Sequence, residues 1–111
     1  MKRPAEARLR DIAAACSAIE RYVDHAEVDD EIVFDAIRIR LVEIGEAVKD
    51  LDGDLISAEP AIPWSDIARM RDHLAHRYFD TAHAIVLTTA RVDIPRLAAA
   101  VNRLLAVPRH P

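Results

Sequence analysis

Glycine, cysteine and aromatic residues are scarce in this chain of 111 residues. Gly45 and Gly53 are its two glycines, and aromatic residues make up 5% of the sequence. A β-sandwich or barrel needs many turns and many aromatic or β-branched residues, so the composition argues against both. Alanine, leucine, isoleucine, arginine and glutamate dominate instead, and these residues favour helices. The sequence therefore predicts an all-α protein.

The lone cysteine and the lack of a long apolar run limit the class of protein further. Cys16 cannot form an intramolecular disulfide, and it lies in an apolar rhythm that is typical of a small core residue. The first residues, MKRPAEARLRD, lack the apolar run of a signal peptide, and no segment approaches the length of a membrane span. We expect one soluble, cytoplasmic domain over residues 1–111, with no membrane contact.

Apolar residues recur at helical spacing in several segments. The first helix begins near Pro4, and its stripe comprises Leu9, Ile12, Cys16, Ile19 and Val23. After a break over residues 25–31, a second helix runs to about Asp50 with a stripe formed by Phe34, Ile37, Leu41, Ile44 and Val48. Ile39 and Val42 widen this apolar surface, which predicts that the second helix packs against more than one neighbour. Gly45 inside it indicates a close approach of another backbone.

The second half of the sequence predicts a loop and further helices. Residues 51–63 contain Gly53, Pro60 and Pro63 and are interpreted as a loop, with Pro63 in the first turn of a third helix. Pro95 lies within the last apolar segment, where it either kinks a helix or starts a new one. The prediction is an up-and-down bundle of four to five helices.

The stretch RDHLAHRY, residues 71–78, concentrates cationic and titratable groups. Between Arg69 and Arg77 three arginines accompany one acid, Asp72, a local charge of +2 within a chain of net charge −4. A basic spot on an acidic body suits a focused anion site better than a broad nucleic-acid surface.

Two simpler interpretations of this stretch remain open. Basic side chains favour helix C-termini, where they complement the exposed carbonyls. Alternatively, a helix continuing past Tyr78 would place His73, His76, Asp80 and His83 on one stripe, and these residue types bind zinc or iron. The sequence at Asp80 and Thr81 suggests a helix break, however, and the nearby arginines would repel a cation.

Phosphodiester chemistry is a third interpretation. Cleaving RNA without a metal requires a base that takes the 2′-OH proton and a fixed cation that stabilises the charge on phosphorus, and His76 and Arg71 are suitable. On a helix His73 lies about 60° from His76, and Arg71 lies about 140° away. A two-fold axis near this helix would bring a second copy of both groups to the same cleft. Arg38 and Arg40 could extend an RNA path, although solvated helix faces commonly carry such residues.

Residues 71–78 resemble the R-x-x-x-x-H-x-Y signature of HEPN-domain proteins, and most closely that of the HepT toxin family. IRLVEIGEAV, residues 39–48, is similar to the second-helix segment of that family. IPWSDIARMRDHLAHRYF, residues 62–79, resembles the family's pattern of a proline, a tryptophan and then an arginine-rich helix. AIVLTTARVDIPRL, residues 84–97, resembles its last helix, which has an internal proline. The resemblance covers residues 30–105 and implies a HEPN-type helical bundle that forms a homodimer.

The resemblance implies a metal-independent endoribonuclease, the toxin of a two-gene toxin–antitoxin module, with no cofactor and no metal. Arg71 and His76 match the catalytic pair. Tyr78 matches the tyrosine to which the antitoxin partner, a minimal nucleotidyltransferase (MNT), attaches AMP. Asp72, His73 and Arg77 are candidate supporting groups or RNA phosphate contacts.

One position departs from the family pattern. The residue after the arginine is often asparagine in the family, and here it is Asp72. A carboxylate could hold Arg71 or His73 in place, but it also weakens the local positive field. It favours the alternative that the protein is a non-catalytic helical dimer that binds a nucleotidyltransferase partner.

Overall fold

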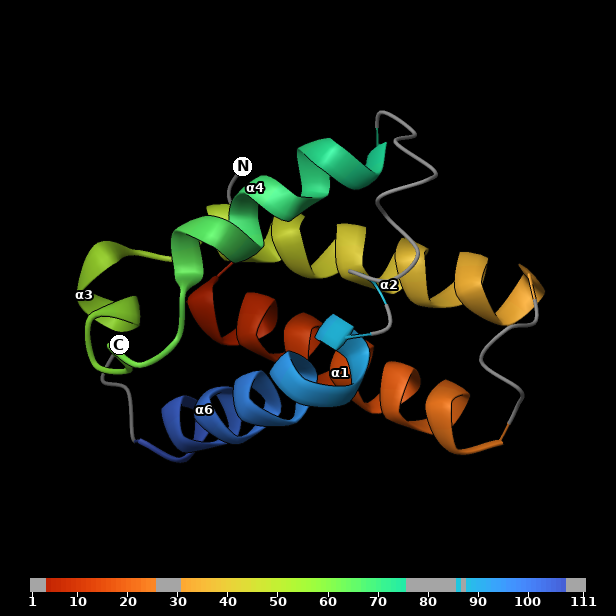
Figure 1. Ribbon diagram of the computed structural model, residues 1–111. Coiled ribbons are helices and arrows are strands. Elements are labelled where there is room, and N and C mark those ends of the chain that lie inside the picture. Colours follow the sequence, from red (N-terminus) through yellow and green to blue (C-terminus); the bar gives the residue numbers. More distant parts are fainter. Residues whose placement is uncertain (1–3, 26–30, 76–85, 87, 108–111) are drawn as a thin grey trace.

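Within the part of the chain that the structure describes, four long helices lie around a common interior (Figure 1), and their apolar stripes are buried there. The computed structural model describes residues 4–25, 31–75, 86 and 88–107. Within these ranges no strand occurs, which confirms the all-α prediction. The elements are α1 (Ala5–His25), α2 (Glu31–Lys49), α3 (Gly53–Ile56), α4 (Trp64–Ala75), the π-helical turn η1 (Thr89–Asp93) and α6 (Ile94–Ala106).

The long helices alternate in direction, as Figure 1 shows for α1, α2, α4 and α6. Helix α2 packs against both α1 and α4, and α1 packs on its other side against α6. The expectation that the second helix has more than one neighbour is therefore confirmed. Ile39 is not responsible for it, because its side chain is 51% exposed. Val42 does pack against the core.

The core consists of the stripes that the sequence spacing indicates. The side chains of Leu9, Ile12, Cys16 and Ile19 in α1 are fully buried, as are those of Ile37, Leu41 and Ile44 in α2. Ile94, Leu97, Ala100, Val101 and Leu104 add the inner face of α6. Gly45 is also buried in α2, which fits a close approach inside the bundle. None of the described helices is long and apolar enough to span a membrane.

Burial changes the chemistry of Cys16. Loss of hydration, and to a smaller extent the nearby Glu20 carboxylate, raises the pKa of its thiol from 9.0 to about 12. At pH 8 to 9 we expect the native thiol to react with a disulfide reagent about 1000-fold more slowly than the thiol of the denatured chain, because so little thiolate forms. Equal rates in the native and denatured protein would contradict this.

The raised pKa of Cys16 also makes the stability of the fold depend on pH. Only the unfolded chain ionises its thiol above pH 9, so the unfolded state then binds fewer protons than the folded state. The contribution of the thiol to stability is therefore complete below pH 9 and is lost as the pH rises toward 12. A Cys16→Ala variant is expected to lack this part of the alkaline loss of stability.

The segment 51–63 is more ordered than a simple loop. It contains the short helix α3, whose end is closed by the Ser57 hydroxyl donating to the Asp54 carbonyl at 3.0 Å. A four-residue helix carries no apolar period, so spacing does not reveal it.

Pro95 does not break the helical backbone, and no loop separates the turn η1 from α6. The backbone keeps helical dihedral angles through Asp93 and Ile94. The Ile94 N–H donates to the Thr89 carbonyl, which is the five-residue spacing of a π-turn. Pro95 follows at the start of α6, and since it has no N–H, the return to four-residue spacing leaves no donor unpaired there.

Candidate active site

Helix α4 carries the first part of the predicted motif in its last turn. The helix starts directly after Pro63, whose carbonyl accepts the Ile67 N–H at 3.1 Å. Trp64 and Leu74 are buried and fix the inner face of the helix. Arg71, Asp72 and His73 follow in its C-terminal half, with the backbone of all three in helical conformation.

The structure describes only part of the predicted set of site residues. Asp72 is described with its side chain, whereas Arg71 and His73 are described by their helical backbone. His76, Arg77 and Tyr78 lie outside the described residues. The geometry of the predicted His–Arg pair and of the tyrosine therefore stays a prediction.

The Asp72 carboxylate points to α2. Its Oδ1 lies 3.5 Å from the Nζ of Lys49, the last residue of α2. Both side chains are about half exposed, so the pair contributes little to stability, ~0–1 kcal/mol. The pair matters more for the local charge than for stability, because Lys49 offsets the negative charge of Asp72, the one acid of the motif.

Arg69 is also paired, with the Asp66 carboxylate one turn earlier in α4. The two ion pairs change which residues carry the local charge of +2 that the sequence indicates. Lys49 offsets Asp72 and Asp66 offsets Arg69, and the remaining two arginines of this stretch, Arg71 and Arg77, have side chains outside the described part of the structure. These are the arginines that flank His76 in the sequence.

Arg38 of α2 reaches the end of α4. Its Nη1 donates to the Leu74 carbonyl at 2.8 Å in a partly buried contact. The interpretation of Arg38 as a solvated residue is therefore wrong. Arg40 fits that interpretation better, because its guanidinium contacts the Glu43 carboxylate at 3.2 Å and the Tyr22 hydroxyl at 3.4 Å.

The start of α4 is held by a different helix. The Trp64 indole N–H donates to the Glu59 carbonyl at 3.0 Å. The Glu59 carboxylate binds Arg103 of α6 through two hydrogen bonds of 2.7 and 3.0 Å. The hydrogen bonds from Arg103 lower the pKa of Glu59 below its ordinary value, so this link persists until the solution is acidic. A single loop residue thus connects the beginning of α4 to α6.

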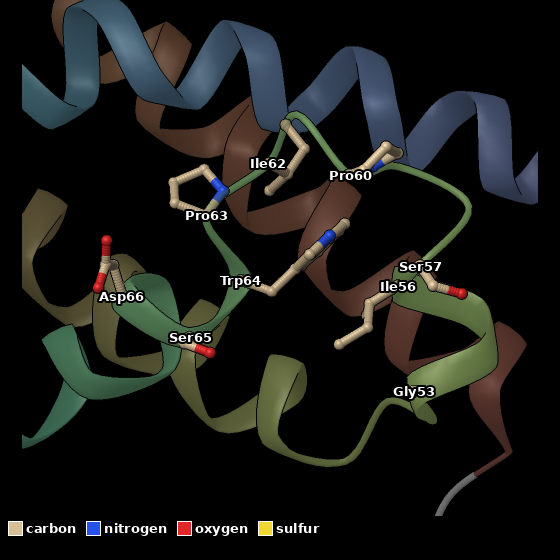
Figure 2. Close-up of a pocket in the computed structure, with 9 residues that line it drawn as sticks. All are labelled: Gly53, Ile56, Ser57, Pro60, Ile62, Pro63, Trp64, Ser65 and Asp66. Carbon is tan, nitrogen blue, oxygen red and sulfur yellow. The ribbon is translucent and has the colours of Figure 1, made fainter.

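A pocket of about 460 Å³ opens beside this loop, but it does not coincide with the motif. Figure 2 shows the Trp64 indole directed toward the loop, with Ile62 and Ile56 on either side. Asp66 is the one charged residue among those that line the pocket. Trp64 and Leu74 lie about 15 Å apart along the axis of α4. An apolar pocket with an acid at its edge, at the opposite end of the helix, is unsuited to RNA phosphate.

A second cavity, of about 410 Å³, lies between α4 and the turn η1. Its charged lining residues are Asp66, Asp93 and Arg96, so it has no excess of positive charge. In the part of the chain that the structure describes, no three histidine, cysteine, aspartate or glutamate side chains group as metal ligands. This finding does not test the alternative metal site, because His76, Asp80 and His83 lie outside the described residues.

Comparison with known proteins gives a consistent result. The model of the family described as "Ribonuclease HepT-like" matches residues 12–104. A protein of Thermococcus cleftensis named "Probable ribonuclease HepT" is 36% identical, over 94% of this chain and 98% of its own length. MJ1216, a candidate RNase of Methanocaldococcus jannaschii, is 32% identical over 94% of this chain and 89% of its own. No solved structure gives a significant match.

Proposed function

Because this chain belongs to the HepT-like ribonuclease family, we propose that it is a metal-independent endoribonuclease, the toxin of a HEPN/MNT toxin–antitoxin module. The observation that carries the proposal is the family match over residues 12–104, which includes the whole stretch 71–78. We place the protein in the cytoplasm as a homodimer of one HEPN domain per chain. RNA is its substrate, and an MNT-type nucleotidyltransferase is its antitoxin.

In the proposed mechanism His76 acts as the general base. It takes the proton from a ribose 2′-OH, and the 2′-oxygen attacks the adjacent phosphorus. A bond from phosphorus to the 2′-oxygen forms as the bond to the 5′-oxygen breaks. The products are a 2′,3′-cyclic phosphate and a free 5′-hydroxyl. Arg71 stabilises the extra negative charge on the phosphoryl oxygens.

The dimer supplies the general acid in this mechanism. One histidine cannot take and give a proton at the same instant, so the partner's His76 protonates the leaving 5′-oxygen. A two-fold axis beside α4 would meet this requirement, because an isologous interface places the same residues of both copies in one cleft.

The pairing of Asp72 supports the catalytic proposal over the non-catalytic one. Asp72 was the sequence feature that favoured a pure binding module, since its negative charge would oppose RNA. Lys49 lies within ion-pair distance of that carboxylate and reduces this effect. Supporting phosphate contacts are assigned to Arg77 and His73.

Tyr78 is the proposed control point. The antitoxin would transfer AMP to the Tyr78 hydroxyl, two residues from His76. The added phosphate would occupy the anion site and repel the RNA backbone.

The test combines RNA cleavage in EDTA with the intact mass of the protein. We expect the chain purified alone to cleave RNA, and the chain co-expressed with a neighbouring nucleotidyltransferase to carry an adenylate and to be inactive. Tyr78→Phe should keep its activity and gain no mass under co-expression.

Two outcomes would contradict the proposal. A dimer without adenylate that cleaves no RNA would indicate the binding module, and Asp72→Asn would then be the first variant to examine. Activity that EDTA abolishes and zinc or iron restores would indicate the metal site.

A further inference from the structure

Arg38 makes a long-range side-chain contact to the last described turn of α4. Its Nη1 donates to the carbonyl of Leu74, a residue 36 positions later in the sequence, at a distance of 2.8 Å. The Nε of Arg38 is buried and finds no acceptor among the described residues. Among the described residues, the guanidinium is thus held by a backbone oxygen, and no carboxylate pairs with it.

This contact joins α2 to the last described turn of α4. Leu74 is the penultimate of the residues that the structure describes in α4, and its carbonyl accepts a hydrogen bond from a side chain of another helix. Arg38 therefore holds this turn from outside, by way of α2.

Stability alone is a weak reason for an arginine at this position. A buried donor without an acceptor costs free energy, and a partly buried charge loses hydration. The arginine is better suited to fixing a geometry than to strengthening the fold.

We propose that Arg38 is a positioning residue of the ribonuclease site at the end of α4. It holds the helical turn that carries Arg71, by way of Leu74, which lies two residues before His76 in the sequence. The inference rests on the proposed ribonuclease function. Arg38 acts through the backbone of α4, whereas an RNA contact would leave the Leu74 carbonyl without this donor.

The experiment compares Arg38→Met, Arg38→Lys and the matched control Arg40→Met, which removes a guanidinium two residues away on the same helix. We expect Arg38→Met to lower kcat for RNA cleavage by about 10- to 100-fold with little change in KM, because misplacing catalytic groups by about 1 Å can cost 10²-fold. Arg38→Lys should recover part of kcat, since lysine can also donate to the carbonyl. Arg40→Met should stay within about twofold of the wild type.

Three results would overturn the proposal. A raised KM with a weaker dependence on salt would make Arg38 an RNA phosphate contact. A loss of kcat that follows a lowered Tm, with no recovery in Arg38→Lys, would make it a structural residue only. An unchanged kcat would show that it has no role in the site.

A second measurement keeps the proposal separate from the ribonuclease assignment. Hydrogen exchange of the amides of residues 71–75 is expected to be faster in Arg38→Met than in Arg40→Met. If the wild type cleaves no RNA, the proposed function fails, and this exchange still tests whether Arg38 holds the turn. Equal exchange in the two variants would show that it does not.

Discussion

His76→Ala is expected to lower the rate of RNA cleavage by about 10²- to 10⁴-fold, the usual contribution of a general base. The loss should appear in kcat, because the imidazole acts in the transition state and adds little to RNA affinity. Cleavage of a short labelled RNA in EDTA, under single-turnover conditions, measures it directly.

The matched control for this variant is His25→Ala. His25 is the last residue of α1 and lies outside the motif. We expect it to cleave RNA at the rate of the wild type. If His76→Ala retained full cleavage and full toxicity in cells, the assignment of His76 as the base would be wrong, and the basic stretch would revert to a helix end with complementary charges.

Leu41→Ala is expected to destabilise the fold by about 2–5 kcal/mol. Leu41 is 0% exposed, in the helix that packs against both α1 and α4. The substitution removes three carbon atoms from the core and leaves a cavity, because the helices packed against α2 cannot fully close it. Denaturation with urea, followed by circular dichroism, gives the change in the free energy of unfolding.

Ile32→Ala is the control for Leu41→Ala. It removes a similar volume from the same helix, but Ile32 is 79% exposed, so we expect a change within about 0.5 kcal/mol. Equal losses in the two variants would mean that burial does not decide the stability of α2. Measuring at several protein concentrations separates an effect on dimer formation from one on folding.

Periodicity predicted the helices because each long one buries a single face. The stripe of α1, from Leu9 to Ile19, and that of α2, from Ile37 to Ile44, are buried as their spacing indicates. The same reasoning failed at Ile39, which is 51% exposed although it is apolar. Apolar character predicts what can be buried, and the arrangement of the other helices decides what is.

Arg38 could not be assigned from the sequence for a related reason. A helical wheel gives the face on which a residue lies, but it does not tell where another helix ends. The Leu74 carbonyl becomes available to Arg38 only once α2 and α4 lie together in opposite directions. Similarly, the sequence does not show that Lys49, 23 positions earlier, lies beside Asp72 and offsets its negative charge. His76 is a candidate base by its residue type and by the family resemblance, whereas the role of Tyr78 rests on the resemblance alone, and both roles are still predictions.

The Glu59 link has a consequence for how this protein could be regulated. Through Glu59 the beginning of α4 is tied to Arg103, while its end is tied to Arg38 of α2. Because α2 and α6 hold α4 at these two places, a sliding or tilting movement of α4 would have to break one of the two links. The adenylate proposed on Tyr78 would act by local charge and bulk, and such a switch would not require α4 to move.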